Sequence, residues 1–123
     1  MLTKIQSEVV RQPDRRIRRA WYQCASADVL LEHDVADGSF LSFEIEGDGG
    51  GGRRWFVSWG RAVGLRTGVV DMGEGDGLSH KASPVVLYDF KNRPDRVDSA
   101  RRLVEGSAIE EGLREAILRR LGS

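Results

Sequence analysis

The stretch DVLLEHDVADGSFLSFEIEGDGGGGRRWFVSW, residues 28–59, decides the fold. Apolar and polar residues alternate from 41 to 46 and again from 54 to 59. A period of two is typical of a strand that buries one face. One Asp and five Gly, residues 47–52, separate the two runs. We therefore predict that they pair as an antiparallel hairpin across this glycine-rich loop.

The side chains of this hairpin also predict a register. The expected pairs are Ile45 with Trp55, Phe43 with Val57, Leu41 with Trp59 and Glu46 with Arg54. These pairs bring large apolar groups together and set opposite charges face to face. A shift by one residue would turn the apolar side chains towards water, so the alternation fixes which face each residue occupies.

A third alternating run, residues 29–34, precedes the hairpin and is joined to it by the turn signal Asp37-Gly38-Ser39. The expected pairs here are His33 with Ser39, Leu31 with Leu41 and Val29 with Phe43. Three strands would then share one apolar face. The opposite face would carry Leu30, Phe40 and Phe56 among Glu32, Glu44 and Arg54, and we expect a helix or a partner to cover part of it.

The segments on either side of this stretch are less regular. Residues 3–10 and 15–23 fit either a strand or a helix, and the sequence leaves both choices open. After residue 59, three glycines among apolar residues favour a bent or bulged fourth strand within residues 60–72. The run PVVLY, residues 84–88, predicts a fifth strand whose leading proline belongs at its first position or on a sheet edge.

The C-terminal part of the chain predicts two helices. Pro94 suits the first position of a helix and Gly106 suits its end. Ser107 and Glu110 have the spacing of a capping box, which places the start of the second helix at Ser107. Apolar residues then repeat at intervals of three and four up to Leu121. We predict a single α+β domain over residues 1–123, an antiparallel sheet of about five strands with two C-terminal helices packed on one face.

Length and composition fit this prediction. A chain of 123 residues with 40% hydrophobic residues is long enough to bury a core without disulfides or metal. The single Cys24 excludes an internal disulfide and multi-cysteine zinc motifs, and we interpret it as a packing residue. No apolar run is long enough to cross a bilayer, and the first residues lack the apolar core of a signal peptide. We expect a cytoplasmic protein without a membrane contact.

Charges are balanced overall but segregated along the chain. Residues 1–27 hold six basic and two acidic residues, whereas residues 28–52 hold seven acidic residues and no basic one. The Arg-rich segment 11–22 combines basic and aromatic side chains, namely Arg15, Arg16, Arg18, Arg19, Trp21 and Tyr22. Such a combination can bind single-stranded nucleic acid through phosphate contacts and stacking. Because the net charge is zero, we favour the alternative that these arginines pair with the acidic strands of the same molecule.

A second candidate site lies in the acidic loop at residues 71–80. Asp71, Glu74 and Asp76 are closely spaced on a glycine-rich segment, and His80 follows them. Carboxylates on a flexible loop can converge on Ca²⁺ or Mg²⁺, and such a site would also allow a metal-dependent enzyme. The spacing does not match an EF-hand, so we favour a solvated loop. His33 and His80 are the only histidines, and neither has a recognisably spaced nucleophile or carboxylate.

Four short stretches resemble a family of small uncharacterised bacterial proteins. They are RRAWYQ at 18–23, DVLLEHD at 28–34 with its turn at 37–39, VSW at 57–59 and KASPVVL at 81–87, where Ser83 stands in place of the family's Thr. The resemblance covers most of residues 15–90. It implies a strand-rich fold and no particular activity.

The sequence thus favours a non-enzymatic protein-interaction or accessory module without a cofactor. Its expected partner is another protein or a second copy of the chain. The first alternative is nucleic-acid binding through segment 11–22, and the further alternative is a cation site or metal-dependent enzyme at residues 71–80. The apolar residues on both predicted sheet faces are the feature that favours the interaction module.

Overall fold

The strands of this protein pair in the order in which they follow along the chain. The computed structural model describes residues 3–12, 15–36, 38–48, 53–71 and 85–122. Within them, seven strands form one sheet in which each strand pairs antiparallel with the next. They are β1 (Thr3–Gln12), β2 (Arg15–Cys24), β3 (Ala27–Asp34), β4 (Phe40–Asp48), β5 (Arg53–Gly60), β6 (Gly64–Asp71) and β7 (Val85–Tyr88).

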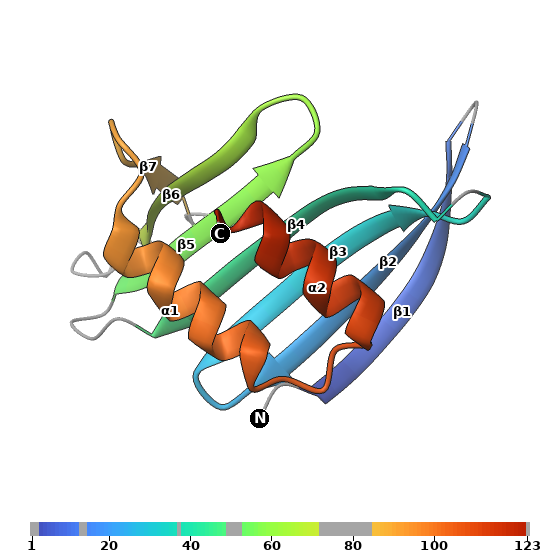
Figure 1. The fold of residues 1–123 in the computed structure, drawn as a ribbon, viewed down its shortest axis with the longest axis horizontal. Coiled ribbons are helices and arrows are strands. Elements are labelled where there is room, and N and C mark those ends of the chain that lie inside the picture. Colours follow the sequence, from blue (N-terminus) through green and yellow to red (C-terminus); the bar gives the residue numbers. More distant parts are fainter. Residues whose placement is uncertain (1–2, 13–14, 37, 49–52, 72–84, 123) are drawn as a thin grey trace, which may run out of the picture.

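Two helices follow the sheet, α1 (Pro94–Glu105) and α2 (Glu111–Arg120), and both lie across one of its faces (Figure 1). This arrangement confirms the predicted α+β class and the order of sheet and helices. Among the described helices, none is long and apolar enough to cross a membrane. The two segments for which the sequence left helix and strand open are both strands, β1 and β2, and they raise the strand number from about five to seven.

The register predicted for the central hairpin is wrong by two residues. Ile45 lies opposite Val57, Phe43 opposite Trp59 and Gly47 opposite Trp55. A Cβ atom at position 47 would collide with the Trp55 indole, so the large ring packs where its neighbour has no side chain. Because a shift of two preserves the alternation, each of these residues still occupies its predicted face.

The predicted pairing of β3 with β4 is also wrong by two, since Val29 lies opposite Ile45 and Leu31 opposite Phe43. The register then shifts at the end of β3, where Phe40 pairs with His33. This irregularity turns Phe40 to the face that carries the helices, where it is buried and joins the core. The prediction that placed Phe40 on the opposite face is therefore wrong.

The core lies between the sheet and the helices. Its members come from β2 to β5 and from the C-terminal segment, and the largest fully buried side chains are Tyr22, Leu31, Phe43, Ile45, Ile109, Ile117 and Leu121. Helix α1 packs against β4, β5 and β6, and α2 packs against β4. The Arg120 guanidinium packs against two aromatic rings of this core, 4.5 Å from the centre of the Trp59 ring and 5.1 Å from that of Phe40.

The ends of the helices follow the sequence signals only in part. Pro94 begins α1 and Gly106 ends it, as predicted. Helix α2 begins at Glu111, so the capping box predicted from Ser107 is wrong. Ser107 is buried, and its hydroxyl donates to the Val104 carbonyl at 2.6 Å. The same hydroxyl accepts from the Ile109 amide at 3.4 Å, so Ser107 links the end of α1 to the segment before α2 and does not cap α2 itself.

A polar cluster ties β6 to the start of α1. The buried Thr67 hydroxyl donates to the Asp89 carboxylate at 2.6 Å, and the Arg96 guanidinium donates to both oxygens of that carboxylate. Asn92 accepts from the Thr67 amide at 3.0 Å and donates to the Leu65 carbonyl at 2.8 Å. These bonds fix β6 and the segment after β7 against α1. They thereby hold in place two residues on the other side of the sheet, Arg66 and Tyr88.

Candidate functional site

The face of the sheet opposite the helices carries the candidate site. We call it the helix-free face and define it by Arg19, Trp21, Leu30, Glu32, Ser42, Glu44, Phe56, Ser58, Arg66 and Tyr88. One row of these residues crosses five strands, because register aligns Trp21, Leu30, Glu44, Ser58 and Arg66. Side chains alternate across a sheet, so this row points away from the core.

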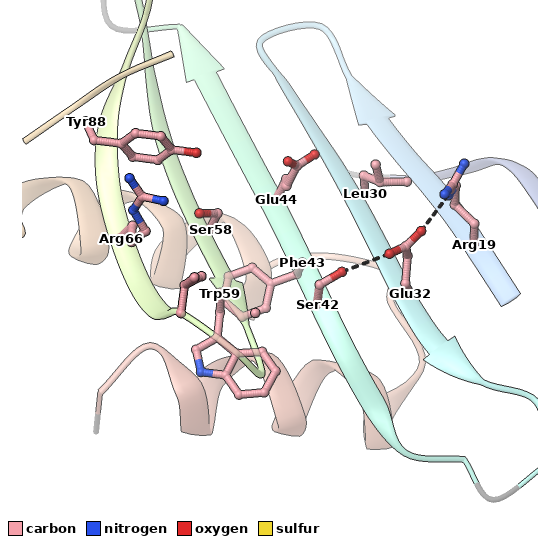
Figure 2. A pocket seen from close by; sticks show the side chains of 12 residues that line it. Arg19, Leu30, Glu32, Ser42, Phe43, Glu44, Ser58, Trp59, Arg66 and Tyr88 are labelled. Atoms are coloured by element: carbon pink, nitrogen blue, oxygen red, sulfur yellow. Dashed lines mark hydrogen bonds and ion pairs between the residues drawn. The ribbon is translucent and has the colours of Figure 1, made fainter. Parts of the chain in front are cut away.

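A hollow of about 400 Å³ lies in the middle of this face, and we call it the central hollow. Its lining includes Glu44, Ser58, Arg66 and Tyr88. Figure 2 shows Arg66 and Tyr88 on one side of the hollow and Glu44 across it, with Ser58 between them. Ser58 lies between Glu44 and Arg66 in the row and has a shorter side chain than either of them. The space above Ser58 is therefore open.

The carboxylates around the central hollow are mostly neutralised by arginines. Arg19 contacts Glu32 at 2.7 Å, and the Ser42 hydroxyl donates to the same carboxylate at 3.1 Å (Figure 2). On the neighbouring row, Arg54 contacts Asp28 at 3.0 Å and Glu46 at 3.2 Å. Each of these carboxylates thus has a cation of the same molecule beside it.

Glu44 differs from its neighbours. Among the described residues, no side chain forms a hydrogen bond or an ion pair with its carboxylate. Glu44 is an exposed residue of β4. Desolvation by the surrounding side chains raises the pKa of Glu44, and the nearby Glu32 and Glu46 raise it further, against a smaller opposing effect of Arg19. The charged form of Glu44 is therefore held in an unfavourable place, which is a common property of residues that bind a ligand.

Arg66 provides the opposite charge. Its guanidinium carbon lies over the Tyr88 ring, 3.4 Å from the ring centre, and Tyr88 packs edge to face with Phe56 with ring centres 6.1 Å apart. Within the described part of the chain, no carboxylate forms an ion pair with Arg66. Stacking fixes the plane of the guanidinium and leaves its N–H groups available for an acceptor.

A second hollow of about 270 Å³ adjoins the first. It shares Leu30 and Glu44 with the central hollow and extends towards Trp21 and Phe56. Two hollows with shared walls make a depression that continues along the row of residues over several strands. Its walls carry apolar, acidic and basic groups, and such a mixed surface is typical of a binding region.

The sequence-predicted nucleic-acid residues do not converge on one surface. Arg16 and Arg18 are exposed and share their side of β2 with the buried Tyr22, whereas Arg19 and Trp21 point to the helix-free face. Arg15 is the first residue of β2. The ion pair between Arg19 and Glu32 is of the internal kind favoured from the sequence, and it joins β2 to the acidic strand β3. Tyr22 is fully buried, so its ring has no open face for a base.

The cation site predicted at residues 71–80 lies almost entirely outside the described residues. Asp71 is the last residue of β6, and Glu74, Asp76 and His80 lie outside the described residues. Among the residues that are described, no group of three or more His, Cys, Asp or Glu side chains is close enough to hold a metal ion. Cys24 is half-buried, and a backbone hydrogen bond from Ser26 is the main cause that lowers its pKa.

Sequence reasoning missed the central hollow, although one signal for it was present. The alternation placed Glu32 and Glu44 together on the face opposite Phe43. The alternation also placed Ser58 on that face, but its position directly beside Glu44 depends on a register that the sequence predicted two residues away from the observed one. Adding Arg66 and Tyr88 requires the pairing of β5 to β7.

Comparisons with known proteins give no neighbour for this fold or site: no protein-family model matches the chain, and no curated protein or solved structure matches it either.

Proposed function

We propose that this protein is a non-enzymatic protein-interaction module that uses its helix-free face to dock a partner protein. The partner is a different protein that inserts a basic side chain, Lys or Arg, into the central hollow beside Glu44. The observation that carries this proposal is the Glu44 carboxylate in the central hollow: no cation of the described residues pairs with it, whereas the carboxylates around it are paired.

Charge complementarity supports a basic group as the occupant. An incoming ammonium or guanidinium would relieve the repulsion of Glu44 by Glu32 and Glu46, which raises its pKa in the free protein. A neutral or acidic occupant would not relieve this repulsion.

The apolar groups on the face support a protein partner over a small ion. Trp21, Leu30 and Phe56 line the adjoining hollow, and the exposed Val63 and Tyr88 border the central one. Aromatic and arginine side chains are enriched at the centres of protein interfaces, where they supply much of the binding energy. A partner surface that covers both hollows would bury the exposed parts of Trp21, Leu30, Val63 and Tyr88 together with the new charge pair, whereas Phe56 is already buried.

Photo-cross-linking tests this proposal. A photoreactive residue replaces Val63, which is exposed at the border of the central hollow and so leaves the space above Ser58 open, and in a matched control it replaces Glu105, which is exposed on α1. Both proteins are made in the organism that encodes the chain and irradiated. The protein captured only from position 63 is then purified, and its affinity is measured for the unmodified chain and for Glu44→Gln.

We expect Glu44→Gln to weaken this complex about tenfold or more, the equivalent of ~1.4 kcal/mol. Glu115→Gln, a matched change at an exposed site on α2, should leave the affinity unchanged. The same capture at 63 and 105, or equal affinities of Glu44→Gln and the unmodified chain, would overturn the proposal. A second copy of the chain or a nucleic acid captured at 63 would overturn the proposed partner.

A further inference from the structure

The central hollow presents two opposite charges, and they do not neutralise each other. Glu44 and Arg66 lie on β4 and β6 and are separated by Ser58 of β5 in the same row. Neighbouring strands are about 4.8 Å apart, so their backbones are about 10 Å apart and their long side chains could approach. No ion pair joins them, and Figure 2 shows Arg66 held against Tyr88 while Glu44 stands across the hollow.

This arrangement keeps a cation and an anion apart within one binding space. The stack on Tyr88 holds the Arg66 plane, and the contact of Tyr88 with Phe56 holds the ring that it stacks on. On the other side of the sheet, the hydrogen bonds of Thr67 keep β6 in place next to Arg66. Groups that are fixed before binding lose little entropy when a ligand arrives.

We infer that the docking surface recognises a pair of opposite charges, with the partner's basic side chain at Glu44 and an acidic side chain of the same partner segment at Arg66. This inference rests on the proposed function and deepens it. The acidic group accepts hydrogen bonds from the guanidinium, whose planar fork matches a carboxylate.

The spacing of the two sites indicates how the partner presents these groups. In an extended segment, residues i and i+2 lie on the same side and about 7 Å apart. Two long side chains at that spacing can reach Glu44 and Arg66 across the short Ser58. A partner segment with a basic residue, any residue and an acidic residue, in either order, therefore fits the hollow.

Capped pentapeptides test this inference directly. The first carries both charges, acetyl-Gly-Arg-Gly-Glu-Gly-amide, together with its order-reversed form; the second replaces Glu by Gln, and the third replaces Arg by Gln. Each is titrated into the ¹⁵N-labelled full chain, and its dissociation constant is taken from the shifts of the amide signals. The same titrations are run on Arg66→Gln, Glu44→Gln and the exposed control Arg102→Gln. The spectra also report whether each variant is folded.

We expect one of the two-charge peptides to bind the unmodified chain about fivefold or more tighter than the peptide with Arg alone. Arg66→Gln should remove that advantage, Glu44→Gln should weaken both peptides, and Arg102→Gln should change neither. Equal binding of the two peptides to the unmodified chain, or an advantage that persists in Arg66→Gln, would overturn the inference. If the inference fails in this way but Glu44→Gln still weakens both peptides, the proposed function stands without the inference. Failure of every peptide to bind would overturn the inference, and the cross-linked partner would then decide the proposed function alone.

Discussion

At the scale of single residues, Glu44 occupies a position that destabilises its charged form. Its pKa is raised by desolvation and by two neighbouring carboxylates, so the folded chain holds a proton on Glu44 more tightly than the unfolded chain does. Glu44 therefore contributes stability that is fully present below its ordinary pKa of 4.5 and is lost as the pH rises through its raised folded pKa. A residue that costs stability at neutral pH is of the kind found in functional sites.

The raised pKa of Glu44 predicts how Glu44→Gln changes the melting temperature. The variant should melt at a higher temperature than the unmodified chain near pH 7, because it removes the repulsion from Glu32 and Glu46. The difference should vanish as the pH falls below 4.5, where the carboxyl group is protonated in both states. Calorimetry of both proteins across this pH range measures the difference in melting temperature. A variant that melts lower at pH 7 would show that Glu44 has a stabilising partner within the chain.

The pKa of Asp89 is shifted in the opposite direction to that of Glu44. Burial pushes the pKa of Asp89 upward, but hydrogen bonds from Thr67 and Arg96 outweigh this effect and lower the pKa. Its contribution to stability is therefore present above the ordinary aspartate pKa and is lost as the pH falls through the lowered folded value. We expect Asp89→Asn to destabilise the protein by about 1.5–3 kcal/mol near pH 7 in urea unfolding. The exposed control Asp98→Asn should cost less than about 0.5 kcal/mol, and equal costs would show that the cluster between β6 and α1 does not fix them together.

At the scale of elements, α2 depends on its contact with the sheet. Ile117 is fully buried, and α2 has no side-chain cap at its first residue. A helix of 10 residues is marginal by itself in water, so its stability comes from packing. Ile117→Ala should cost about 2–5 kcal/mol in chemical denaturation, while Arg119→Ala on the exposed side should cost less than about 0.5 kcal/mol. A cost of Ile117→Ala below about 1 kcal/mol would mean that α2 is not docked.

The elements also show how far the sequence could predict this fold. Alternation correctly assigned Phe43, Ile45 and Val57 to the buried face, because the penalty for exposing them is local to each strand. It could not distinguish registers that differ by two residues, since both keep the alternation. The observed register depends on Trp55 packing over Gly47 and on the irregularity beside His33, and both are contacts between strands.

The site was less predictable than the fold for the same reason. Glu44 was assigned to its face, but Arg66 and Tyr88 join it only through the pairing of β5, β6 and β7. The Arg-rich segment appeared as one cluster in the sequence, whereas a strand sends alternate residues to opposite faces and thereby divides it. A choice between helix and strand was needed before that cluster could be interpreted, and the sequence left this choice open.

At the scale of the whole molecule, this division of the arginines bears on nucleic-acid binding. Arg16 and Arg18 lie on one face of the sheet, and Arg19 on the other is paired with Glu32. We expect a single-stranded oligonucleotide to bind more weakly than about 10 μM at physiological salt. Replacing Arg16 and Arg18 together by Gln should change the salt dependence of this binding little. Micromolar or tighter affinity that is lost in the double variant would favour the nucleic-acid alternative.

The docking proposal concerns the molecule as a two-sided sheet, with the core on one face and a partner on the other. Ser58→Leu tests this most directly, because it fills the central hollow and leaves all charged groups in place. Its affinity for the partner captured at position 63 is measured beside that of Ala108→Leu, a leucine substitution at an exposed position near the helices. We expect Ser58→Leu to melt within about 3 °C of the unmodified chain and to bind the partner about tenfold more weakly or worse, with Ala108→Leu unchanged. Unaltered affinity in a folded Ser58→Leu protein would contradict the assignment of the helix-free face as the docking surface.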